Sequence, residues 1–73
     1  MRGKLPLLSG QEIVNALQRI GYYVRRQKGS HIRLYHPERL PVTVPAHQEV
    51  DRRTLKSILR ATNLTVEEFK KLL

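Results

Sequence analysis

The sequence predicts an α+β fold in which a helix, three antiparallel strands, a second helix and a short C-terminal helix follow one another. Two segments, 10–20 and 52–62, carry apolar residues at helical spacing behind capping residues. Between them, apolar and polar residues alternate at the spacing of a half-buried strand. A sheet of three strands is unstable alone, and each main helix is apolar on one side only. Both main helices are therefore expected to pack on one face of the sheet.

The first helix is expected from Gly10 to Ile20. Ser9 and Glu12 have the spacing of a capping box, in which each side chain bonds the other residue's backbone amide. Gly21 can adopt the left-handed conformation that ends a helix. The apolar stripe of this helix consists of Ile13, Leu17 and Ile20, widened by Val14 and Ala16.

The first strand is expected over residues 22–27, where β-branched and aromatic residues are dense. Val24 is the only aliphatic residue in this segment, so the face that carries it is placed against the helices. At a period of two, Tyr22 and Arg26 share the face of Val24, and Tyr23, Arg25 and Gln27 lie on the opposite face.

The second strand is expected over residues 31–36, joined to the first by the hairpin turn Lys28-Gly29-Ser30. Its alternation places Ile32 and Leu34 toward the core. The opposite, solvent-facing side then carries an imidazole, a guanidinium and a phenol in a row, from His31, Arg33 and Tyr35.

Prolines delimit a short third strand. Pro37 ends the second strand because proline cannot donate to the hydrogen-bond ladder. Pro41 and Pro45 bracket residues 42–44, which read Val-Thr-Val. The three strands therefore form a meander.

Capping residues also delimit two C-terminal helices. Asp51 is a good N-cap for a helix over residues 52–62, which Asn63 can end in a left-handed conformation. Thr65 and Glu68 form a second capping box, which starts a short last helix. The residues expected in the core are Leu55, Ile58 and Leu59 of the longer helix, and Phe69, Leu72 and Leu73 of the last one.

Length and composition restrict the class of protein. A chain of 73 residues is expected to form a single domain over residues 1–73. With no cysteine it has neither disulfides nor thiolate metal ligands, which favours a reducing compartment. No apolar run approaches the roughly 20 residues of a membrane helix, and residues 1–6 lack the apolar region of a secretory signal. A soluble, cytoplasmic protein that makes no contact with membranes is expected.

Charge is the most informative part of the composition. The chain has 14 Lys and Arg against 6 Asp and Glu, a formal net charge of +8 and a pI near 10.7. A small domain this basic repels itself unless an anionic partner neutralises it, and nucleic acid is the usual partner. An acidic protein would satisfy the same charge.

His31 is the main candidate for catalysis. Histidine exchanges protons near neutral pH, and RNA cleavage needs a proton taken from a ribose 2′-hydroxyl or given to a departing 5′-oxygen. Lys28 and Arg33 would stabilise the extra charge of a pentacoordinate phosphate, and Gly29 lets backbone amides approach an anion. A histidine after a hairpin turn also serves simply as a surface or hydrogen-bonding residue.

Other chemistries fit these residues less well. His31 and His36 are five positions apart, so they point to opposite faces of a strand, and no cysteine or close acidic pair completes a metal site. Ser30 and His31 diverge as neighbours, and no acid is evident to orient the imidazole, so Ser30 is interpreted as a turn residue or phosphate donor. No metal or other cofactor is expected.

The sequence resembles the HicA-type toxins, small messenger-RNA interferases of bacterial and archaeal toxin–antitoxin pairs. The resemblance runs from about Ser9 to Phe69. It is carried by Ile20-Gly21-Tyr22, Gln27-Lys28-Gly29-Ser30-His31, Val42-Thr43-Val44-Pro45 with His47 after it, and Thr54-Leu55-Lys56-Ser57-Ile58-Leu59. Asp51-Arg52-Arg53 precedes Thr54 here, where many members carry a glycine just before that threonine.

The resemblance implies a double-stranded-RNA-binding-domain-like fold in the order α-β-β-β-α. It implies a metal-independent endoribonuclease that cleaves messenger RNA, inhibited by a HicB-type antitoxin covering the active site. The catalytic histidine of the family maps onto His31 and its glycine onto Gly29. The residues expected to bind RNA are Arg25, Arg26, Lys28, Gly29, Ser30, Arg33, Arg52 and Lys56.

Two alternatives use the same residues differently. The first is a non-catalytic double-stranded-RNA-binding module, because Arg52-Arg53-Thr54-Leu55-Lys56 looks like the basic helix start of such domains. The second is a DNA-binding regulator that inserts its second main helix into a major groove, although no helix-turn-helix spacing is present. An exposed edge strand could pair with a second copy or an antitoxin, so the free chain is expected to be a monomer or weak dimer.

Overall fold

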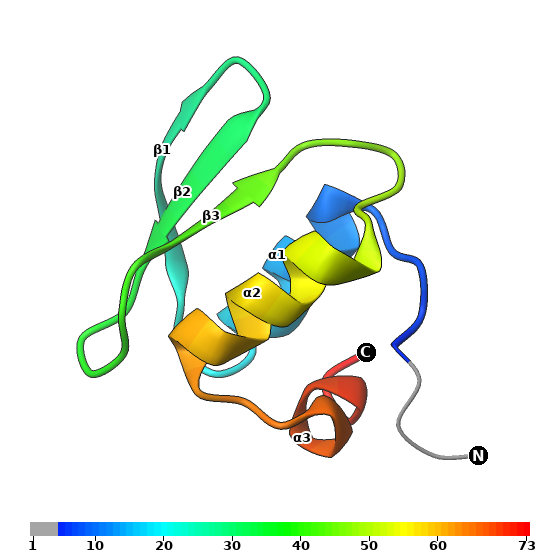
Figure 1. The fold of residues 1–73 in the computed structure, drawn as a ribbon. Helices are drawn as coiled ribbons and strands as arrows, with labels where there is room; N and C mark the ends of the chain where they lie inside the picture. Colours follow the sequence, from blue (N-terminus) through cyan, green and yellow to red (C-terminus); the bar gives the residue numbers. More distant parts are fainter. Residues whose placement is uncertain (1–4) are drawn as a thin grey trace.

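The computed structural model describes residues 5–73, so the expectation for residues 1–6 lies partly outside the described residues. The elements follow in the predicted order (Figure 1). They are α1 (Gly10–Gln18), β1 (Tyr23–Lys28), β2 (His31–Tyr35), β3 (Val42–Pro45), α2 (Arg52–Thr62) and α3 (Val66–Lys70). Among the described residues, no helix has the length and apolar content needed to cross a membrane.

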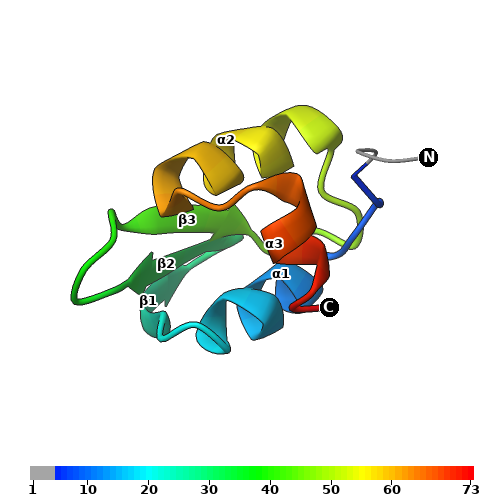
Figure 2. The same ribbon diagram turned by 90° about the horizontal axis from the view of Figure 1, so that it is seen from below.

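The three strands form an antiparallel sheet in the order β1-β2-β3. Both α1 and α2 pack against β3, and Figures 1 and 2 show them on the same side of the sheet. α3 lies beside these two helices and away from the strands (Figure 2). The predicted α+β, double-stranded-RNA-binding-domain-like architecture is confirmed, and the other face of the sheet is left open.

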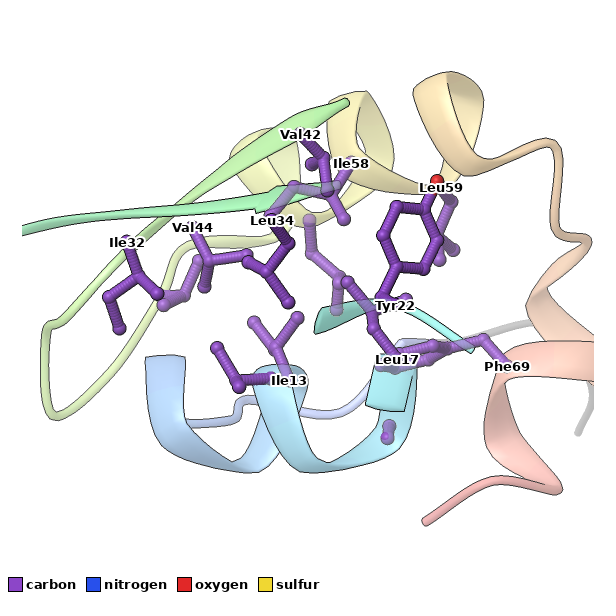
Figure 3. Close-up of a cluster of buried hydrophobic side chains, with 14 of the residues drawn as sticks. Ile13, Leu17, Tyr22, Ile32, Leu34, Val42, Val44, Ile58, Leu59 and Phe69 are labelled. Atoms are coloured by element: carbon purple, nitrogen blue, oxygen red, sulfur yellow. The ribbon is translucent and has the colours of Figure 1, made fainter. Parts of the chain in front are cut away.

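The core fills the space between the covered face of the sheet and the helices (Figure 3). Ile32 and Leu34 are 5% and 0% exposed, which confirms the predicted register of β2. Below them lies the apolar stripe of α1, and above them that of α2. Phe69 of α3 is also fully buried and closes the core at the end remote from the hairpin.

The ends of α1 follow its local chemistry. The capping box is formed, with the Ser9 amide 2.9 Å from Glu12 Oε1 and the Glu12 amide 3.1 Å from Ser9 Oγ. The regular helix ends at Gln18, two residues before the predicted end, because the last turn tightens. Gly21 then closes it at φ +105°, while the Tyr22 amide donates to the Leu17 carbonyl.

The C-terminal helices start and stop as predicted. Asp51 Oδ1 accepts from the Thr54 amide at 2.7 Å, and this bond, with a smaller contribution from nearby Arg53, lowers the pKa of Asp51 below its ordinary value. Asn63 ends α2 at φ 60°. The Thr65 capping box starts α3. The prediction that Leu73 returns to the core is wrong, since this residue is 52% exposed just beyond the helix.

The segment before α1 contributes to the core, which the sequence patterns did not indicate. Leu5 is 2% exposed, and Leu8 forms an isolated antiparallel bridge with Val50. The Arg52 Nε donates to the Leu5 carbonyl at 2.6 Å. The start of α2 is therefore tied to the N-terminal segment.

A β-bulge corrects the predicted register of β1. The strand covers residues 23–28 rather than 22–27, and its pairing with β2 shifts between Val24 and Arg26. Arg26 therefore pairs with Arg33 on the open face, not on the helix side. Gln27 pairs with Ile32 on the helix side, not on the open face. One extra residue, Arg25, reverses the alternation beyond it.

The predicted packing of Val24 against the helices is also wrong. Val24 pairs with Leu34, so it lies on the helix side, yet it is 42% exposed. All six residues of β1 are exposed, because the helices pack on β3 at the other edge. Tyr22, just before β1, is 3% exposed and provides the core contact instead. Its burial raises the pKa of its phenol, although the nearby charge of Arg39 opposes this.

The other strands differ from prediction by one residue at an end. β2 stops at Tyr35 and leaves His36 outside the ladder. β3 continues through Pro45, which pairs with His31. Proline is tolerated there because β3 is an edge strand.

Candidate nucleic-acid interface

The open face of the sheet carries a shallow hollow of about 440 Å³, here named the His31 concavity. All three strands contribute to it. Its lining residues are Arg25, Arg26, Lys28, His31, Arg33, Tyr35 and Thr43. Four of these seven are Lys or Arg and none is acidic, so the hollow is strongly electropositive.

The β1–β2 hairpin places His31 at the rim of this concavity. Lys28 and His31 form the closing pair of the ladder, and only Gly29 and Ser30 connect them. Gly29 has φ +58°, as the first central residue of a type II′ turn requires. The turn therefore fixes the cation of Lys28 directly across the strand pair from the imidazole.

The bulge in β1 enriches the concavity in charge. In a regular strand, Arg25 and Arg26 would point to opposite faces. The extra residue instead leaves both among the residues that line the concavity. Two successive arginines therefore line the same hollow, an arrangement that the sequence pattern alone did not predict.

Tyr35 organises the guanidinium groups at the other end of the concavity. The Arg25 guanidinium carbon lies 5.3 Å from the centre of the Tyr35 ring, and that of Arg33 lies 5.8 Å from it. The Arg33 Nη1 also donates to Thr43 Oγ1 at 2.7 Å. Tyr23 lies next to Tyr35, with 6.4 Å between the ring centres. These contacts hold the cations in place without neutralising them.

The two histidines of this region have different surroundings. His31 is exposed, and among residues 5–73 its ring makes no hydrogen bond. Both ring nitrogens of His36 are engaged: Nδ1 accepts from the Glu38 amide at 2.9 Å, and Nε2 lies 2.8 Å from the Ile20 carbonyl. Since a carbonyl only accepts, Nε2 is the donor to Ile20 in this arrangement. His31 is therefore the histidine that a ligand can reach.

The structure brings seven of the nine predicted site residues together. Arg25, Arg26, Lys28 and Arg33 line the concavity beside His31, and Gly29 and Ser30 form the adjoining turn. Arg52 and Lys56 do not line it. Arg52 instead donates to the Leu5 carbonyl, and Lys56 is exposed on α2.

Three residues near the site were absent from the predicted set. Tyr35 and Thr43 line the concavity. The sequence feature that indicated them is the period-two alternation of β2 and β3, which places these two residues on the open face. Arg53 lies in a neighbouring hollow that also contains Arg33 and Thr43. Nothing local in the sequence distinguishes Arg53 from Arg52.

His47 lies apart from the His31 concavity. His47 is exposed beside the start of α1, where its backbone carbonyl accepts from the Gly10 amide at 2.9 Å. Among residues 5–73, no group of three or more His, Cys, Asp or Glu side chains is placed to hold a metal ion.

The fold and this face define a small α+β protein whose open sheet surface is electropositive and concave. The family model described as "HicA toxin of bacterial toxin-antitoxin" matches residues 10–64, which include every element from α1 to α2. The chain therefore belongs to the HicA toxin family.

A solved structure agrees with this assignment. A chain from a structure described as "Toxin-Antitoxin complex from Streptococcus pneumoniae" superposes with a TM-score of 0.69 at 29% sequence identity. The match covers 78% of this chain and 98% of that chain. Among curated proteins, none matches the chain.

Proposed function

We propose that this chain is the toxin of a toxin–antitoxin pair and acts as a metal-independent endoribonuclease on messenger RNA. The observation that supports this best is the His31 concavity, which joins one accessible imidazole to four cations on an open face. A single-stranded phosphodiester can approach such a face, and cytoplasmic messenger RNA supplies that substrate. Membership of the HicA toxin family supports the toxin role.

The proposed reaction needs proton transfer but no attacking water in the cleavage step. The ribose 2′-oxygen bonds to phosphorus while the bond from phosphorus to the 5′-oxygen breaks. His31 takes the proton of the 2′-hydroxyl or gives a proton to the departing 5′-oxygen, and solvent, which is not the nucleophile, exchanges the other proton. The products carry a 2′,3′-cyclic phosphate and a free 5′-hydroxyl.

The cations act where charge increases. The phosphate gains negative charge as it becomes pentacoordinate, and fixed cations stabilise that state more than the ground state. The pairing of Lys28 with His31 and the bond of Arg33 to Thr43 support these two residues in this role. Arg25 and Arg26 hold the flanking backbone, with Gly29 and Ser30 offering turn amides. Arg52 and Lys56 stay predictions as RNA contacts outside the concavity.

The proposed antitoxin is a HicB-type protein that covers the concavity. An acidic surface would neutralise the same cations that RNA neutralises, so toxin inhibition and RNA binding would be mutually exclusive. The match to a chain of a toxin–antitoxin complex supports a protein partner of this kind.

Cleavage of a single-stranded RNA by wild type and His31→Ala, with and without EDTA, tests the proposal. Wild type should cleave equally well in EDTA and leave cyclic phosphate ends, and His31→Ala should bind the RNA but not cleave it. Cleavage that requires added metal would contradict the metal-independent mechanism. Equal cleavage by the variant would remove His31 from it.

The runner-up function is a non-catalytic module that binds double-stranded RNA. The exposed cations would support binding as well as cleavage, so the same experiment separates the two. A binding module would show a steep salt dependence, a preference for duplex and no product. Growth arrest on expression, relieved by His31→Ala, would favour the toxin.

A further inference from the structure

A second hollow lies between the free edge of β3 and the helix α2, and we name it the β3–α2 groove. Its volume is about 460 Å³. Figures 1 and 2 show α2 alongside β3, and Figure 3 places Val42 of β3 beside Ile58 of α2. The groove is lined by Arg33, Pro41, Val42, Thr43, Arg53, Thr54, Ser57, Ile58 and Ala61.

This groove continues from the His31 concavity. Arg33 and Thr43 line both hollows, and the hydrogen bond between their side chains forms the boundary that the two share. A ligand strand that leaves the concavity across β3 therefore passes directly into the groove.

The edge of β3 presents a free backbone donor here. Ala46 N donates to the Ser30 carbonyl, so His31 and Pro45 form a pair without mutual hydrogen bonds. Alternation makes Arg33 and Thr43 the next such pair. The amide of Thr43 therefore points away from β2, and among the described residues no further strand lies beyond β3.

The polar groups of the groove are mainly donors. Arg33 and Arg53 supply guanidinium groups, Thr54 and Ser57 supply hydroxyls, and none of the lining residues is acidic. Arg53 is exposed on the first turn of α2. An anionic backbone satisfies such a set better than a neutral ligand does.

We propose that the β3–α2 groove binds the RNA backbone on one side of the cleaved bond, with Arg53 holding a phosphate. This rests on the proposed function, because the strand in the groove is the one cleaved beside His31. A peptide that adds a strand to β3 fits less well, since Pro41 and Pro45 leave too few edge amides for a ladder.

Fluorescence anisotropy with 2′-O-methyl oligonucleotides tests the groove in the wild-type background, because this RNA lacks the attacking hydroxyl. A dinucleotide and an octanucleotide are compared on wild type, Arg53→Gln and the charge-matched control Arg19→Gln at the exposed C-cap of α1. Arg53→Gln should weaken octanucleotide binding about three- to tenfold and leave the dinucleotide unchanged. Its slope of log K against log salt should fall by about 0.7, the share of one single-strand phosphate.

A second variant guards against an effect of folding. Ser57→Glu places a carboxylate in the groove and should weaken the octanucleotide at least as much as Arg53→Gln, with an unchanged melting temperature. If wild type binds and cleaves RNA but Arg53→Gln behaves like Arg19→Gln, the groove proposal is overturned and the proposed function stands. Binding of an acidic peptide of alternating Glu and Val at β3, with RNA affinity indifferent to Arg53, would also overturn it.

Discussion

The two histidines at the ends of β2 have opposite surroundings. His31 begins the strand at an exposed rim, beside Lys28 and among guanidinium groups. His36 follows the strand at the other end, where its ring contacts Tyr22 and joins the end of α1 to the loop after β2. The difference teaches that an imidazole with both nitrogens engaged acts as a structural link, whereas an unengaged one is available for proton transfer.

The largest effect that would sharpen this comparison is expected from His31→Gln. Glutamine keeps a polar side chain at the rim but cannot exchange a proton near neutral pH. RNA cleavage in single turnover should fall by about 10²- to 10⁴-fold, the usual contribution of general acid–base catalysis. Stability should be unchanged, because no hydrogen bond is lost among residues 5–73. A fall in the cleavage rate of less than threefold would contradict a catalytic role for His31.

The reverse result is expected from His36→Leu. This change leaves the Ile20 carbonyl and the Glu38 amide without their side-chain partner, which should lower the free energy of unfolding by about 1–3 kcal/mol. Cleavage per folded molecule should stay within twofold of wild type. Urea denaturation measures the effect, with His47→Leu as a control at an exposed histidine. Equal stability of the two variants would contradict the structural role of His36.

A glycine lies near each histidine: Gly29 in the turn before His31, and Gly21 against the His36 ring. Substituting these two glycines gives a smaller, matched test. A Cβ on Gly29 would meet no atom within 4 Å, so Gly29→Ala should cost only the backbone strain of φ +58°, about 1–2 kcal/mol. A Cβ on Gly21 would lie 3.0 Å from His36 Nε2 at φ +105°, so Gly21→Ala should cost more. Thermal unfolding of both variants checks the order. A larger loss at Gly29 would show that the link through His36 adapts freely.

The smallest effect is expected at Asp51, the N-cap of α2, which lies apart from both histidines in the sequence. The pKa of Asp51 is lowered by its bond to the Thr54 amide, so its charged form stabilises the fold above the ordinary value near 3.8. That stabilisation is lost as pH falls through the lower, folded-state pKa. Asp51→Asn should therefore melt closest to wild type below the folded-state pKa and differ most from wild type above about pH 4. A constant difference from pH 2 to pH 7 would contradict this assignment.

Most of the fold was predictable because its signals are local. The capping boxes of Ser9 and Thr65, the left-handed Asn63 and the Gly-Ser turn each depend on residues within a few positions of one another. The alternation in β2 identified its buried side, because only one face of the sheet is covered. These features need no knowledge of distant contacts.

The candidate site was predictable only in part. His31 and Arg33 share the open face by strand period alone, and the predicted turn brings Lys28 next to His31. The position of Arg26 depended on a bulge, which arises from pairing with β2 and has no signature in residues 22–27. Arg52 and Arg53 look alike in the sequence, yet one contacts Leu5 and the other lines the β3–α2 groove.

The sequence by itself determined the order of helices and strands, the hairpin that presents His31 and the excess of positive charge, because composition and short-range chemistry specify these. Only the tertiary structure decided that Arg25 and Arg26 share a face and that His36 links two elements. It also decided that a second groove continues from the concavity at Arg33 and Thr43. Each of these features depends on the register and packing of segments that are distant in the chain. The physical reason is that strand register is fixed by which side chains are buried in the shared core, and no short segment of sequence determines that alone.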